Sequence, residues 1–255
     1  MAGVAGRTPS MIEPMATPSP QFTLVEPELG VGGELRAGTS WMDRVAHDLR
    51  GPLSPVRTAV YLLRESSLAD AQRDELLAML ERQIQRLSGM IDQFSDLGRA
   101  ETGRLLARRE SVDVEQLLGD LAGRLQGRSP RIELAPDVSG LQVEGDVLRL
   151  AQLFETLLGL RLVRGCVGPV QARVERTGDG LRMSCVLHCR DASDALVAGL
   201  LASPHPDPPD DSLGFGLPIA AAIASAHGGR LQGRATARDT VELVLDLPCA
   251  GARPE

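Results

Sequence analysis

The sequence has 255 residues and a net charge of −7, and 43% of its residues are hydrophobic while only 2% are aromatic. This length fits one large or two modest domains, whose cores must be built from aliphatic side chains. The acidic balance argues against a nucleic-acid-binding protein, which would carry a basic stripe. No run approaches the length of a membrane span, and residues 1–10 lack the apolar core of a signal peptide. We therefore expect a cytoplasmic location.

The four cysteines are scattered along the second half of the chain: Cys166, Cys185, Cys189 and Cys249. Cys185 and Cys189 are close in sequence, but they fall in a strand-like segment without a second pair of ligands. We therefore expect no metal site and buried free thiols in a reducing compartment.

Residues 1–38 are rich in Pro, Gly, Ser and Thr and show no sustained period, which predicts a flexible tail. Over residues 39–105 we expect a helical hairpin, with helices from about Ser40, as an N-cap, to 64 and from about 69 to 98. Apolar residues spaced by three and four carry this prediction: Trp41, Val45, Leu49, Leu53, Val56, Val60 and Leu63, then Leu77, Leu80, Ile84, Leu87, Ile91 and Phe94. This is the heptad pattern of a bundle. Because such a hairpin exposes its own seam, we expect a homodimer that forms a four-helix bundle.

From about residue 111 to residue 249 the pattern changes to alternating helices and strands. Helices are expected over 114–125, 147–164, 193–202 and 217–226, and strands over 131–134, 141–143, 170–176, 181–189, 230–236 and 240–247. This order predicts an α+β domain with helices on one face of a mixed sheet. Residues 250–255 are expected to form a short tail.

The segment from His47 to Leu53 reads His-Asp-Leu-Arg-Gly-Pro-Leu. His47 lies off the apolar stripe, so its imidazole should reach solvent, where it is a nucleophile near pH 7 whose phosphorylation gives a readily transferred phosphoramidate. Asp48 can hold the proton of the other ring nitrogen. Pro52 should kink the helix. A plain surface histidine is the alternative, but the heptads, the proline and the downstream domain together favour a reactive one.

Residues 40–100 resemble the dimerisation and phosphoacceptor domain of sensor histidine kinases, whose motif is His-Glu/Asp-x-x-Thr/Asn-Pro-Leu. The resemblance implies that His47 is the phosphoacceptor, that Asp48 is its acid/base partner, and that the partner protein is a response-regulator receiver domain. Gly51 stands where the family has the Thr or Asn that positions water for dephosphorylating the regulator. The resemblance therefore implies poor phosphatase activity.

The stretch from Gly214 to Leu231 resembles the Gly-x-Gly-Leu-Ala-Ile … His-Gly-Gly-x-Leu pattern of the ATP-binding domain that histidine kinases share with gyrase and a class of heat-shock chaperones. The resemblance implies an α/β-sandwich fold in which Gly214 and Gly216 let backbone amides approach phosphate. The same family has two asparagines on a helix, the second of which binds Mg²⁺ through its side-chain oxygen, and here Thr156 and Leu160 stand at those two positions. Leucine has no oxygen to offer. Glu155 should point about 140° away from Leu160 on the expected helix, and so should not replace it.

The box that contacts adenine keeps its aspartate, Asp191, but Ser193 and Ala195 replace its two glycines. Residues 203–211, which would cover the nucleotide, are proline-rich and acidic and should repel a triphosphate. The ATP site therefore reads as degenerate.

Three functions fit these observations. In the first, the chain is a histidine phosphotransferase that needs no cofactor and relays phosphoryl groups through His47. In the second, it is an active kinase that uses ATP and Mg²⁺; in the third, it is a non-catalytic dimeric scaffold for a response regulator. The missing Mg²⁺ ligand disfavours the kinase, and the motif around His47 disfavours the scaffold. No sensor domain precedes the hairpin in this sequence, so we expect the input to come from a partner or from residues 1–38.

Overall fold

The computed structural model describes residues 38–64, 68–125, 130–162, 166–178, 180–209, 212–237 and 239–249, without the side chains of 38–44 and 237. These residues belong to one compact unit that spans 34–255. The predicted tails, apart from residue 38, lie outside the described part of the chain.

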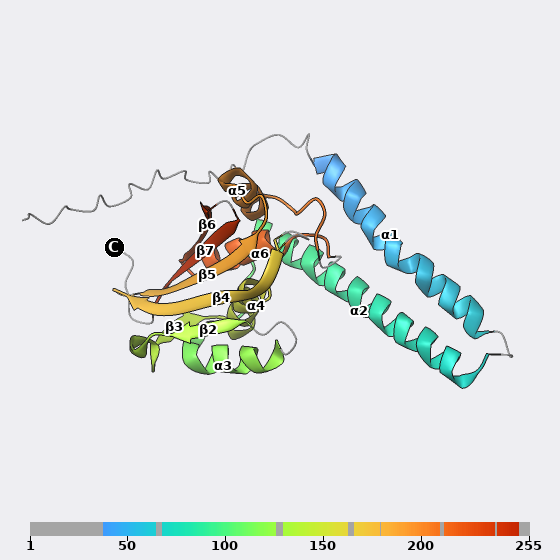
Figure 1. Cartoon of the computed structure of the whole chain (residues 1–255), viewed down its shortest axis with the longest axis horizontal. Helices are drawn as coiled ribbons and strands as arrows, with labels where there is room; N and C mark the ends of the chain where they lie inside the picture. The colour runs from blue at the N-terminus through green and yellow to red at the C-terminus, as the bar shows by residue number, and fades with distance from the viewer. Residues whose placement is uncertain are drawn as a thin grey trace, which may run out of the picture. The chain divides into compact units, whose positions relative to one another are not determined.

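The elements follow one another as two long helices and then as an alternation of strands and shorter helices (Figure 1). They are α1 (Gly38–Leu63), α2 (Asp70–Glu101), β1 (Glu110–Asp113), α3 (Val114–Arg124), β2 (Arg131–Leu134), the 3₁₀ helix η1 (Pro136–Val138), β3 (Gln142–Gly145), α4 (Val147–Leu158), β4 (Cys166–Thr177), β5 (Gly180–Cys189), α5 (Asp194–Ala202), α6 (Gly216–Ala226), β6 (Arg230–Ala237) and β7 (Thr240–Pro248).

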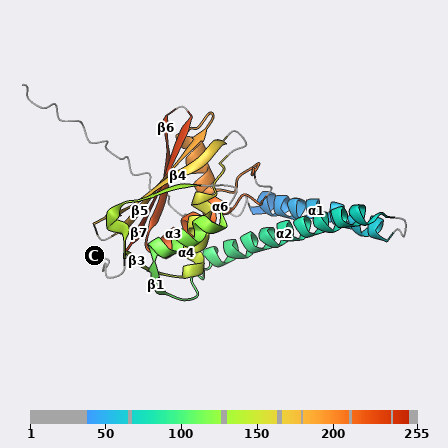
Figure 2. The same cartoon turned by 60° about the horizontal axis from the view of Figure 1, so that its bottom comes forward.

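Helices α1 and α2 form the predicted antiparallel hairpin and contact each other (Figures 1 and 2). The inner face of α1 includes the buried residues Val45, Pro52 and Ala59, which follow one another at intervals of seven. α1 begins at Gly38, two residues before the expected N-cap, and it stays helical through Pro52, so the proline does not interrupt it. None of the described helices is both long enough and apolar enough to cross a membrane.

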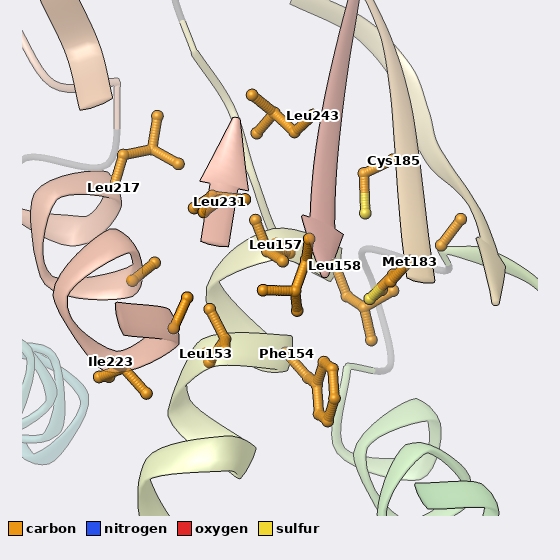
Figure 3. Packing of buried hydrophobic residues seen from close by; sticks show 14 of the residues in the cluster. Leu153, Phe154, Leu157, Leu158, Met183, Cys185, Leu217, Ile223, Leu231 and Leu243 are labelled. Atoms are coloured by element: carbon orange, nitrogen blue, oxygen red, sulfur yellow. The ribbon is translucent and has the colours of Figure 1, made fainter. Parts of the chain in front are cut away.

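A mixed five-stranded sheet forms the second part, with strand order β2-β4-β5-β7-β6, and β1 pairs with β3 in a separate two-stranded sheet. Only the β2–β4 pair is parallel. Alternate residues of β5 and β7 are buried, as expected for strands with one face in the core. Figure 3 shows the core where side chains of α4 and α6, including Leu153, Leu157 and Ile223, meet those of the strands. The predicted α+β fold is therefore confirmed.

Two helix and strand predictions need correction. Helix α4 ends at Leu158 rather than near 164, because Gly159, a weak helix former, provides its C-cap. Strand β1 (Glu110–Asp113) was missed, since its partner β3 lies about thirty residues further on and supplies the pairing that so short a segment cannot signal by itself.

The expectation of free thiols is wrong for two of the four cysteines. Cys166 and Cys189 form a disulfide. Cys185 and Cys249 keep their thiols, and burial raises the pKa of the Cys185 thiol to about 12. The predicted strand began at Val170, four residues after Cys166, so no strand pairing between Cys166 and Cys189 was expected.

Candidate functional site

His47 lies on α1 with 84% of its side chain exposed. Its Nδ1 atom is 3.2 Å from Oδ1 of Asp48, the next residue along the helix. Because an ionised carboxylate can only accept a hydrogen bond, Nδ1 is the donor in this contact, and in the neutral ring the contact selects the tautomer with its lone pair on Nε2. The geometry therefore presents an exposed imidazole whose Nδ1 side is held by Asp48.

Gly51 and Pro52 lie about one helical turn beyond His47. Pro52 is buried against the hairpin, whereas Gly51 is exposed. Apart from its chain neighbours and the nearby backbone of its own helix, no atom lies within 4 Å of the place where a Cβ on Gly51 would stand. A threonine or asparagine would therefore fit, and what is missing beside His47 is a polar side chain and not the space for one.

A cavity of about 260 Å³ lies at the C-terminal end of α4. Its volume is smaller than the roughly 300–1,000 Å³ usual for small-molecule sites. The cavity is bordered by α2, the last turns of α4 and the residues after it, the start of α6, and residues 205–209 and 212–214, which we call the lid. The lining residues are Gln93, Gln152, Glu155, Thr156, Gly159, Leu160, Arg161, Leu162, Leu200, His205, Pro208, Pro209, Ser212, Gly214, Gly216 and Leu217.

The cavity brings together four of the residues that the sequence analysis assigned to a nucleotide site: Thr156, Leu160, Gly214 and Gly216. Asp191 is not among them. It is exposed in the turn after β5 with φ of 57°, and its backbone N–H donates to Asp239 in the β6–β7 turn. The structure therefore does not bring the expected adenine contact to the cavity.

The expected angle of about 140° between Glu155 and Leu160 is wrong. It assumed one helix through both residues, but α4 ends at Leu158 and the chain then turns. Glu155 is exposed and borders the same cavity as Leu160. The hydroxyl of Thr156 is less available as a hydrogen-bond donor to a ligand in the cavity, because its Oγ1 donates to the carbonyl oxygen of Gln152 at 2.8 Å.

Gly214 is needed for a close contact with His205 within the lid. Its φ is 79°, and a Cβ there would stand 2.6 Å from the carbonyl oxygen of His205. The N–H of His205 donates back to the carbonyl of Gly214 at 2.9 Å. A Cβ on Gly216 would meet only Thr156 at 3.7 Å, an ordinary contact. The first glycine of the pair thus serves the lid itself.

The His205 side chain holds the lid against the cavity. Its Nδ1 accepts the backbone N–H of Asp207 at 2.9 Å, so Nε2 carries the proton and donates to the carbonyl of Leu162. This bond joins the lid to the segment that follows α4. The cavity thus has the lid residues His205, Pro208 and Pro209 and the aliphatic Leu160 in its lining. Asp191 lies outside that lining.

Asp96, near the end of α2, anchors a polar contact with α4 that the sequence analysis missed. It is buried, its Oδ1 lies 2.7 Å from Nη1 of Arg149, and its Oδ2 accepts from Nε2 of Gln152 at 2.7 Å. One turn earlier, Oε1 of Gln93 accepts the backbone N–H of Leu213 in the lid at 3.2 Å. The last turns of α2 thus contact both α4 and the lid. An aspartate in a heptad-like helix is the only signal the sequence held.

Asp146 and His227 form a second buried polar pair at the N-terminal end of α4. The N–H of Asp146 donates to Nε2 of His227, whose Nδ1–H donates to the carbonyl of Ile223. Burial would raise the pKa of the Asp146 carboxyl, but backbone N–H donors lower it overall. The donors are Ala107, Arg108, Leu148 and Arg149. Burial also lowers the pKa of His227 below its usual 6.5.

The depressed pKa of His227 predicts a loss of stability in acid. The folded state favours the neutral imidazole, so its contribution is complete above pH 6.5 and is lost as the pH falls from there toward the folded-state pKa. Each unit of depression is worth about 1.4 kcal/mol. The free energy of unfolding of the protein and of His227→Gln should therefore converge between pH 7.5 and 5. Gln can still accept from the N–H of Asp146 but does not titrate, so a difference that stays constant with pH would contradict the prediction.

Residues 39–103 match the family described as His Kinase A (phospho-acceptor) domain. The sensor protein ChvG of Rhizobium meliloti (strain 1021) is 27% identical over 237 residues, which cover 82% of this chain but only 40% of that protein. Among solved structures, the histidine kinase AdeS of Acinetobacter baumannii aligns with a TM-score of 0.61 at 17% identity over 79% of this chain and 97% of that one. The histidine kinase ThkA, solved with the response regulator protein TrrA, aligns with a TM-score of 0.61 at 15% identity over 84% of this chain and 62% of that one. At these identities the two structures bear on the fold alone.

Proposed function

The chain belongs to the sensor histidine kinase family of two-component signalling proteins, and we propose that it is a phosphotransferase that accepts a phosphoryl group on His47 and exchanges it with a receiver aspartate. One observation carries the proposal. The imidazole of His47 is exposed, and its Nδ1–H is held by Asp48, which leaves Nε2 free to attack phosphorus. Asp48 also stabilises the positive charge that develops on the ring during attack.

A receiver aspartyl phosphate is the preferred phosphoryl donor in this proposal. ATP is disfavoured because the cavity holds Leu160 at a metal-ligand position and is bordered by the lid residues His205, Pro208 and Pro209. The solved complex of ThkA with a response regulator is a precedent within the same fold for a receiver partner.

The hairpin has an unpaired apolar stripe that supports a homodimer. Leu77, Ile84 and Ile91 follow at intervals of seven on α2 and are 46%, 55% and 55% exposed in the single chain. Leu53 and Val60, also seven apart on α1, are 45% and 48% exposed. Heptad-spaced apolar residues left uncovered by one hairpin are those that a second hairpin would cover in a four-helix bundle.

Phosphoryl transfer from a receiver, without transfer from ATP, is the test of the proposal. Receiver domains phosphorylated with radioactive acetyl phosphate should pass label to the full chain in an acid-labile, base-stable linkage that maps to His47. The same protein incubated with γ-labelled ATP and Mg²⁺ should stay unlabelled, and calorimetry should give a Kd weaker than about 1 mM, or about −4 kcal/mol.

Two results would overturn this assignment in different directions. Label on His47 from ATP alone would make the chain an active kinase. If receivers bind the chain but none of them transfers a phosphoryl group to it, the chain is a scaffold.

A further inference from the structure

The disulfide between Cys166 and Cys189 closes the open end of the β4–β5 hairpin. Cys166 is the first residue of β4 and Cys189 is the last of β5, and the two are directly paired across the strands. The hairpin turn, at Gly178, lies at the other end of the same two strands. The cross-link therefore stands where the two strands separate into different loops.

Backbone pairing holds this end of the hairpin weakly. The strand register breaks between Val167 and Gln171. Gly168 lies between them with φ of 78°, and Pro169 has no N–H to donate to the ladder. Only the pairs of Cys166 and Val167 lie beyond the break, so the disulfide is the main restraint on these residues.

The restrained end is coupled to the lid through the segment that follows α4. Leu160 and Arg161 border a cavity of about 80 Å³ together with Cys166, and both also border the larger cavity beneath the lid. The next residue, Leu162, provides the carbonyl that accepts the His205 imidazole. A displacement of Cys166 would thus be transmitted to the bond that holds the lid.

On the β5 side, the backbone of the cross-linked Cys189 contacts the turn between β6 and β7. The N–H of Cys189 donates to the carbonyl oxygen of Asp239, and the N–H of Asp191 donates to the Oδ1 atom of the same residue. The cross-link therefore lies within a few residues of Leu162, whose carbonyl bonds the lid, on one side and of the Asp191 turn on the other.

We propose that Cys166 and Cys189 are a reversible thiol–disulfide pair whose oxidation locks the lid over the cavity and whose reduction releases it. The oxidant is a low-molecular-weight disulfide such as oxidised glutathione. The partly exposed Cys166, as a thiolate, attacks one sulfur of oxidised glutathione, and one glutathione thiolate leaves. The Cys189 thiolate then displaces the second from Cys166, so that two protein thiols and one oxidised glutathione give one protein disulfide and two reduced glutathiones. The proposal is independent of the phosphoryl donor.

The other two cysteines differ in their suitability for this chemistry. Cys185 is fully buried, and its raised pKa keeps it a thiol. Cys249 is half-buried near the C-terminal end of β7 and provides a thiol that can be removed as a control.

The test compares the same full-length protein in reduced and oxidised glutathione buffers. Alkylation followed by peptide mass spectrometry should find the Cys166–Cys189 peptide pair linked in the oxidised buffer and both thiols alkylated in the reduced one. Hydrogen exchange of the Asp191 and Asp207 amides, whose bonds lie on the two sides of the cross-link, should be at least about 10-fold faster in the reduced protein.

Two variants distinguish an effect of the Cys166–Cys189 pair from an effect of another thiol. Cys166→Ser should exchange at the fast rate in both buffers, whereas Cys249→Ser should respond to the buffer as the unsubstituted protein does. Absence of the linked peptide in every buffer, or equal exchange of both amides in the linked and reduced forms, would overturn the proposal.

Discussion

Replacing His47 with alanine should abolish phosphoryl acceptance and leave the fold intact. The side chain is 84% exposed, so the free energy of unfolding should change by no more than about 0.5 kcal/mol. Removing the imidazole removes the nucleophile itself, so acid-labile label from a phosphorylated receiver should fall to background. Thermal unfolding of the variant provides the check that the hairpin is still formed.

His188 supplies the matched control. It is also an exposed histidine, but it lies on β5 and its ring is near the hydroxyl of Thr240. His188→Ala should therefore label like the unsubstituted protein. Asp48→Asn should keep the acceptor but slow transfer by about two orders of magnitude, because the neutral amide can still accept the Nδ1–H bond but does not stabilise the positive charge that develops on the ring. Full labelling of His47→Ala would place the acceptor elsewhere in the chain.

The parts of the structure that depend on local periodicity could be predicted from the sequence. The two long helices were predicted from heptads, and the off-stripe position of His47 followed from the same spacing. Most strands of the second part were predicted within a few residues, since alternation of buried and exposed residues in β5 and β7 is a local pattern.

The errors concern features that depend on pairing between distant segments. The disulfide requires β4 to begin at Cys166, four residues before the predicted strand, where Gly168 and Pro169 read as a turn. The adenine contact of Asp191 stays a prediction, but in the structure its N–H donates to Asp239 and it does not border the cavity, which the motif alone could not indicate. Motif register fixes the order of residues along the chain, but tertiary contacts decide which of them share a site.

Glu155 and Gly214 illustrate the same limit within the cavity. A single glycine at 159 ended α4 early and brought Glu155 to the same rim as Leu160, which a helical projection could not anticipate. Gly214 looked like a phosphate-contacting glycine, whereas its positive φ and close approach belong to the contact with His205. At both positions the sequence identified a residue of the cavity, but it did not predict which residue lies next to it.

Substitution of Ile84 by aspartate should dissociate the proposed homodimer without unfolding the hairpin. In the single chain Ile84 is 55% exposed, so an aspartate there can stay hydrated in the monomer. In a dimer the same position would be covered by the partner's hairpin, and burying an unpaired carboxylate costs several kcal/mol. A cost of about 4 kcal/mol corresponds to a dissociation constant roughly 10³-fold weaker. Light scattering over a concentration series, with helix content followed by circular dichroism, measures both expectations.

Gln85→Asp is the control, because it adds the same charge one residue further along α2. Successive helical residues differ by about 100° in direction, so Gln85, which is also exposed, lies off the stripe of Leu77, Ile84 and Ile91. This variant should dimerise like the unsubstituted protein. If Ile84→Asp stays dimeric, the stripe on α2 is not the interface. If both variants dissociate equally, the general increase in negative charge on α2 is responsible, and the heptad argument for the interface fails.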